Sequence, residues 1–177
     1  VGATGLDVTA GRDIRFQATG AIDFDVSGAI TLDAMTIFVN GSLTGTGISI
    51  TGDVELDSGS GAGQTIDAGT GALSVTGEVR KTDGGLLTLD GAATLDGAGL
   101  QTLTAGGALS ATGTVTKATG DLVLDGTSLD LDGDVEATAG GLTLDGTIAA
   151  AGDLTAGTGL TLDGAATLDG AGLQTLT

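Results

Sequence analysis

The chain has 177 residues, 35 of them glycine, and its 23 acidic and 5 basic side chains give a formal net charge of −18. It has no histidine and no cysteine, so it lacks the commonest general base, the thiol nucleophile and the usual ligands of transition metals. Paired carboxylates can hydrolyse glycosides, but the chain offers neither tryptophan nor tyrosine as a sugar platform. We therefore predict that the protein is not an enzyme.

The basic residues and the hydropathy pattern argue against two further classes of partner. Five dispersed Lys and Arg side chains cannot neutralise a run of phosphates, so we expect no nucleic acid partner. No apolar run approaches the ~18 residues of a bilayer-spanning helix, so we expect no membrane insertion. The absence of cysteine is typical of secreted bacterial repeat proteins, in which stray disulfides would obstruct export.

Residues 1–45 are the least regular part of the chain and hold all three phenylalanines and the single methionine. Apolar and polar residues alternate in 21–26 and in 29–33. Because successive side chains of a strand point to opposite faces, this alternation predicts short strands. We expect the phenylalanines to pack in the core of these irregular coils: Phe16, Phe24 and Phe38.

Residues 46–177 repeat a shorter pattern more regularly. Leu-x-Leu-Asp runs occur at 87–90, 122–125 and 142–145, and Gly-containing pairs separate such runs as turns separate strands. A glycine at about every fifth position would destabilise any helix by about 1 kcal/mol each. We therefore predict an all-β structure without helices.

The chain also repeats itself at longer range. Residues 87–104 return letter for letter as 160–177, and Gly-Ala-Leu-Ser at 71–74 returns at 107–110. Gln-Thr followed by Ile or Leu begins at three glutamines: Gln64, Gln101 and Gln174. The offsets of 73, 36 and 37 residues indicate a unit of 18–20 residues, two of which make a repeat of about 36. A copy that runs to the last residue leads us to expect a longer array.

Short strands at a fixed period predict a single-stranded parallel β-helix, in which each coil stacks on the next at ~4.8 Å. We predict about 9 coils of 18–20 residues in one continuous solenoid over residues 1–177. Residues 1–45 would form less regular coils, and 46–177 regular coils in two-coil repeats of about 36 residues. The absence of proline agrees with this fold, because proline removes a donor from the ladder.

Twenty of the 23 acidic residues are aspartates, often directly before glycine, which is turn chemistry. Stacked corners would also align carboxylates along the rod, where calcium could bind several oxygens. The strongest local candidate is the segment 130–136, which begins like an EF-hand loop but has Val135 at the sixth position and Gly141 at the twelfth. Its candidate calcium ligands are Asp130, Asp132, Asp134 and Glu136.

Three segments point to a family. They are Gly-Gly-Leu-Thr-Leu-Asp-Gly at 140–146, Gly-Ala-Leu-Ser-Ala-Thr-Gly at 107–113 and Gly-Asp-Leu-Thr-Ala-Gly-Thr-Gly at 152–159. This pattern of short glycine-bounded repeats resembles the repeat regions of filamentous haemagglutinin-like proteins, which are large secreted or surface adhesins of bacteria. The resemblance implies a right-handed parallel β-helix, an extracellular or cell-surface location, and a role in adhesion or biofilm.

Two functions are expected on this basis. In the first, the segment is the structural shaft of a bacterial adhesin or surface fibre that presents a binding region to a receptor or matrix. In the alternative, it is a self-assembling subunit of an extracellular filament or sheath, whose rods either stack end to end or bundle through calcium bridges. Neither function requires a cofactor, and calcium is the one ion that could take part.

Overall fold

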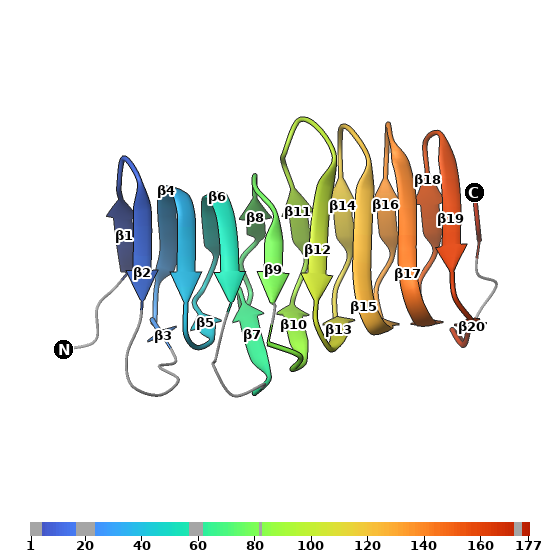
Figure 1. Cartoon of the computed structure of the whole chain (residues 1–177), viewed down its shortest axis with the longest axis horizontal. Helices are drawn as coiled ribbons and strands as arrows, with labels where there is room; N and C mark the ends of the chain where they lie inside the picture. Colours follow the sequence, from blue (N-terminus) through green and yellow to red (C-terminus); the bar gives the residue numbers. More distant parts are fainter. Residues whose placement is uncertain (1–4, 17–23, 57–61, 82, 172–174) are drawn as a thin grey trace.

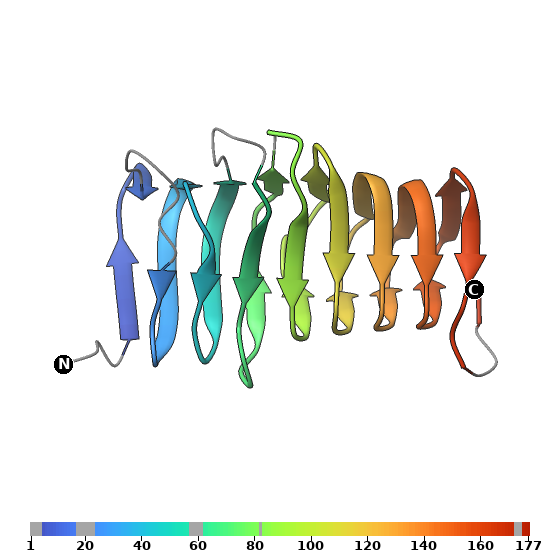
Figure 2. The same ribbon diagram turned by 90° about the horizontal axis from the view of Figure 1, so that it is seen from below.

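The computed structural model describes residues 5–16, 24–56, 62–81, 83–171 and 175–177, and its described part contains twenty β-strands and no helix. All strands belong to one parallel sheet that is wound into a β-solenoid of about 8 turns (Figure 1). This architecture confirms the predicted single-stranded parallel β-helix. Strands β1 and β19 lie at opposite ends of the rod, as Figure 2 also shows. The described residues accordingly contain no helix of the length and apolarity that crossing a membrane requires.

Each turn contributes one strand segment to each of three faces, which we call the first, second and third face. The first face consists of β1 (Gly5–Thr9), the leading parts of β4 (Ala29–Val39) and β6 (Ile48–Leu56), β8 (Leu73–Val75), β11 (Ala93–Leu95), β14 (Val115–Lys117), β16 (Val135–Ala137) and β18 (Leu154–Ala156). The second consists of β2 (Asp13–Phe16), the trailing parts of β4 and β6, β9 (Val79–Lys81), β12 (Gln101–Ala105), the leading parts of β15 (Leu122–Leu131) and β17 (Gly141–Ala150), and β19 (Gly159–Asp163). The third consists of β3 (Phe24–Asp25), β5 (Leu43–Thr44), β7 (Gln64–Asp67), β10 (Leu87–Asp90), β13 (Ala108–Ala111), the trailing parts of β15 and β17, and β20 (Ala166–Leu168).

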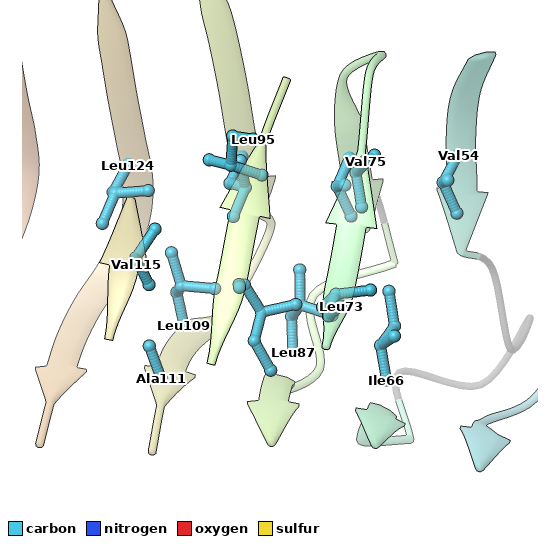
Figure 3. Packing of buried hydrophobic residues seen from close by; sticks show 14 of the residues in the cluster. Val54, Ile66, Leu73, Val75, Leu87, Leu95, Leu109, Ala111, Val115 and Leu124 are labelled. Carbon is cyan, nitrogen blue, oxygen red and sulfur yellow. The ribbon is translucent and has the colours of Figure 1, made fainter. Parts of the chain in front are cut away.

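Inward side chains stack in ladders along each face, because strands pair in register from turn to turn. On the second face the ladder runs through Ile14, Ile37, Val54, Val79, Leu103, Leu124, Leu144 and Leu162. All but the last are buried, and similar aliphatic side chains fill the interior between the faces (Figure 3). The alternation seen in the sequence therefore places one residue in two inside the rod.

The turns vary more in length than the predicted 18–20 residues. The shortest advance on the first face is 18 residues, from Ile30 to Ile48, and the longest is 25, from Ile48 to Leu73. The longest turn contains the connection 57–63, and the 22-residue turn from Ala93 to Val115 contains the loop 96–100. These longer connections explain why the chain makes about 8 turns instead of 9.

The sequence repeat and the turn do not coincide. Leu73 lies on the first face, whereas Leu109, its counterpart 36 residues later, lies on the third. Leu87 begins the 18-residue repeat on the third face, and Leu160 begins its identical copy on the second. Each repeat thus falls one face short of a whole number of turns, so the 36-residue repeat is not two coils as predicted. Leu-x-Leu followed by a glycine corner suits any of the three faces.

The structure confirms the predicted core role for one phenylalanine and contradicts it for another. Phe16 packs against the core. Phe38 instead points outward on the second face, where the guanidinium carbon of Arg15 lies 3.8 Å from its ring centroid. The side chain of Phe24, residues 21–23 and Gln174 lie outside the described residues. The core of the first turns is therefore built mainly from isoleucine, leucine and valine.

Glycines stack at the corner between the third and first faces. A Cβ atom placed on Gly133 would lie 2.4 Å from the carbonyl carbon of Gly113, and one on Gly152 would lie 2.4 Å from that of Gly133. Successive turns approach so closely here that only glycine fits. A glycine at this corner is a packing requirement as well as a turn residue.

We expect Gly133→Ala to lower the free energy of unfolding by about 1–3 kcal/mol, because the backbone must shift to relieve the overlap. Chemical denaturation followed by circular dichroism measures this. Gly159→Ala is the matched control, since a Cβ there meets nothing within 4 Å, and its change should stay within about 0.5 kcal/mol. Equal losses in both variants would contradict the packing argument.

Candidate functional site

The outer surface of the second face carries a column of side chains in ladder register. From one end of the rod to the other it reads Arg15, Phe38, Glu55, Arg80, Thr104, Asp125, Asp145 and Asp163. The last three carboxylates occupy consecutive rungs at the ~4.8 Å spacing of paired strands. Like charges at this spacing repel one another, and salt or a cation would reduce the repulsion. The column is thus basic at one end of the rod and acidic at the other.

Several other aspartates join one turn to the next. Asp121 Oδ1 accepts a hydrogen bond from the Gly141 N–H at 2.7 Å, and Asp53 Oδ1 accepts one from the Glu78 N–H at 3.0 Å. Asp134 and Asp153 do the same for the turns that follow them. None of these four aspartates precedes glycine, and their carboxylates cap backbone groups of the neighbouring turn. Part of the negative charge therefore serves the fold.

The predicted calcium ligands lie on different parts of a turn. Asp130 is exposed on the third face, and Asp132 and Asp134 lie at the following corner. Glu136 is the middle residue of β16, on the first face. Asp134 Oδ1 accepts the Asp153 N–H at 2.8 Å, and Glu136 Oε1 accepts the Thr138 hydroxyl at 3.0 Å. In the described part of the chain, no three acidic side chains gather closely enough to hold a metal ion. Calcium binding by this segment stays a prediction.

Two lysine–glutamine pairs are buried inside the solenoid, and sequence reasoning missed both. In the first, Lys81 Nζ donates to Gln64 Oε1 at 3.0 Å and to a carboxylate oxygen of Asp83. Gln64 Nε2 donates to the carbonyls of Val39 at 3.2 Å and Gly41 at 2.9 Å. The pair therefore spans three successive turns at the corner between the second and third faces.

The second pair repeats this arrangement at the corner between the first and second faces. Lys117 Nζ donates to Gln101 Oε1 at 3.2 Å and to the carbonyl of Gly97. Gln101 Nε2 donates to the carbonyls of Val75 at 2.9 Å and Gly77 at 2.7 Å, and its Oε1 also accepts the Gly97 N–H at 3.0 Å. Every hydrogen-bonding position of the Gln101 amide is thus occupied.

Burial also affects the pKa of the lysine in the second pair. Loss of hydration lowers the pKa of Lys117, and the charges of Asp96 and Asp121 partly oppose this effect. The sequence did contain a signal for both lysines. Val79-Arg-Lys81 and Val115-Thr-Lys117 place lysine where Leu-x-Leu places its second, inward leucine. An unpaired buried charge would be costly at these positions, and the glutamines supply hydrogen-bond partners.

A surface pocket of about 320 Å³ lies beside the second pair. Its wall includes Asp53, Glu78 and the 97–101 segment, and Leu100 at its rim is 62% exposed.

No protein-family model, characterised protein or solved structure matched the chain. Inference about function therefore rests on the geometry of the rod itself.

Proposed function

We propose that the protein is the structural, non-catalytic shaft of a bacterial extracellular adhesin or surface fibre. The observation that supports this most is the continuous parallel ladder of the second face, which runs from Ile14 to Leu162. A rod whose strands all pair with both neighbours resists bending and leaves few backbone groups open to proteases. Such a rod would hold a receptor- or matrix-binding region away from the cell surface.

The surface charge suits this role. A net charge of −18 keeps neighbouring rods apart in solution. The five bases do not gather into a patch that would bind phosphate-rich partners. Solubility with mutual repulsion is what a densely displayed surface fibre requires.

Electron microscopy of the native assembly, with and without a calcium chelator, tests the proposal. The shaft predicts single thin rods that are unaffected by chelation and longer than the ~40 Å that about 8 stacked turns span. Bundles that dissociate on chelation would contradict it and would favour calcium-bridged assembly.

The second candidate function, a self-assembling filament or sheath subunit, is favoured by the charge column of the second face. A second copy whose β2 pairs with β19 would take the place of residues 175–177 beside β18, and it would add Ile14 to the ladder after Leu162 and Arg15 to the column after Asp163. Arg15 would then extend a run of three carboxylates with an opposite charge. Calcium between those carboxylates is the alternative way to offset their repulsion.

Under this second function, Asp163→Arg should weaken end-to-end association of the 177-residue protein on the order of fivefold, as loss of one exposed ion pair implies. Combining it with Arg15→Asp should restore association, because the pair is recreated with its charges exchanged. Sedimentation velocity at low and high salt measures this. Arg80→Asp is the control, because Arg80 lies in the same outer column but in a middle turn, away from both ends of the rod. This variant should leave association unchanged. A protein that stays monomeric under all conditions would rule out this second function.

A further inference from the structure

The ammonium group of Lys81 is enclosed by the core of the solenoid. The side chain is fully buried, and its neighbours in the ladder are Leu56 in the turn before and Ala105 in the turn after, both buried as well. Surroundings of this kind keep water away from an amine. Proton transfer to a neighbouring group would leave a neutral, nucleophilic amine in a dry site.

The group that faces this amine is a carboxamide held at a fixed orientation. Both hydrogens of Gln64 Nε2 are used by the carbonyls of Val39 and Gly41, which turns Oε1 towards Lys81. Nζ lies 3.0 Å from Oε1, so the amide carbon Cδ is one bond beyond the contacted atom. Gln64 is 2% exposed, and Leu87 occupies the next rung of its ladder. Reactants held this close gain much of the advantage of an intramolecular reaction.

A proton carrier completes the arrangement. The carboxylate of Asp83 is hydrogen-bonded to the same Nζ, and this side chain is only 12% exposed. A carboxylate in this position can take a proton from the amine and later return it to a leaving group. Nucleophile, acceptor and acid–base group are thus gathered at one buried corner.

We propose that Lys81 and Gln64 join in an intramolecular isopeptide bond, with Asp83 as the proton carrier. Asp83 first takes a proton from Nζ, and the neutral amine attacks Cδ of Gln64. The tetrahedral intermediate carries Nζ and Nε2 on one carbon, so the Asp83 carboxyl can move a proton from Nζ to Nε2. The bond between Cδ and Nε2 then breaks, and ammonia leaves. Of the three protons on Nζ, one stays on the new amide, one departs with ammonia and one remains with the Asp83 carboxyl.

This bond would fasten β9 to β7 and close a covalent ring across neighbouring turns. The inference goes beyond the shaft proposal and does not depend on where the rod is displayed. Lys117 and Gln101 form the natural comparison, because there the second acceptor of Nζ is the Gly97 carbonyl, which cannot take a proton. We therefore expect one cross-link, at the first pair only.

The intact mass of the purified 177-residue protein tests the proposal directly. The mass should fall below that calculated from the sequence by one molecule of ammonia. Trypsin digestion of the unfolded protein should then give residues 16–80 joined to 81–117, because a modified Lys81 is not cleaved. An intact mass equal to the calculated one, in protein whose circular dichroism is that of a β-sheet, would overturn the inference.

Variants separate the roles of the three residues. Asp83→Asn should keep the fold and restore the full calculated mass, since the proton carrier is lost while a polar partner for Nζ remains. Lys81→Arg should also show no loss of ammonia. Lys117→Met is the matched control and should still lose one ammonia. Loss of ammonia in the Lys81→Arg variant would assign the reaction to another residue and refute the proposal.

Discussion

Replacing Gln101 with leucine is expected to lower the free energy of unfolding by about 3–5 kcal/mol, the cost of removing the partner of a buried charge. The leucine would leave the Val75 and Gly77 carbonyls without their side-chain donor, and Lys117 Nζ with the Gly97 carbonyl alone. Urea denaturation followed by circular dichroism measures the loss. A change below about 1 kcal/mol would show that Lys117 is hydrated in the folded state.

Lys117→Met is the control for this interpretation. It removes the charge and fills the same space, so its effect should stay below about 1.5 kcal/mol. The Gln101 amide then keeps the Gly97 N–H as a donor to Oε1. A large loss in both variants would instead indicate that the lysine–glutamine contact itself stabilises the fold.

The pH dependence of stability tests the desolvation of Lys117 independently. The pKa of Lys117 is lowered by desolvation from its ordinary value of 10.5. Between the lowered value and 10.5 the unfolded chain binds more protons than the folded one, so the contribution of Lys117 to stability rises with pH in this window. The free energy of unfolding of each protein is measured as a function of pH. Subtracting the values of Lys117→Met from those of the wild type should reveal this rise. A difference that is flat or falls with pH would contradict a desolvated lysine.

The second large loss of stability is expected when a side chain of the apolar ladder on the second face is shortened. Leu124 is 1% exposed and lies between Leu103 and Leu144. Leu124→Ala should cost about 2–5 kcal/mol, because the paired strands above and below cannot close over the cavity. The denaturation midpoint of the purified variant measures this.

Leu168→Ala is the matched control, since Leu168 is 40% exposed on the last strand of the third face. Its cost should remain near 0.5 kcal/mol. Because each turn contacts only its neighbours, Leu124→Ala should also speed hydrogen exchange mainly in β12, β15 and β17. Uniform loss of protection over the whole rod would instead indicate all-or-none unfolding.

The sequence was sufficient to predict the fold, and the reason lies in its short-range pattern. Leu122, Leu124, Leu142 and Leu144 alternate with outward residues, and all four are buried. The order of the strands around the axis was not predictable from the same pattern. Nothing in Leu-x-Leu distinguishes one face from another, so identical segments fold onto different faces.

The candidate sites were less predictable than the fold. Asp134 has the residue type and spacing of a calcium ligand, yet its Oδ1 accepts a backbone hydrogen of the next turn. Lys81 has the residue type of a solvated base, yet it is fully buried. Both outcomes depend on which groups of the next turn lie opposite, and this is set by turn lengths that vary with the connections 57–63 and 96–100.

The mismatch between repeat and turn has a consequence for how such a rod can grow. Duplication of a 36-residue segment adds a whole number of strands but not a whole number of turns. The strands still pair, so the new copy folds, but every surface group it carries is rotated about the rod axis by about a third of a turn relative to the original. Tandem duplication therefore distributes copies of an exposed group around the circumference instead of lining them up along one side.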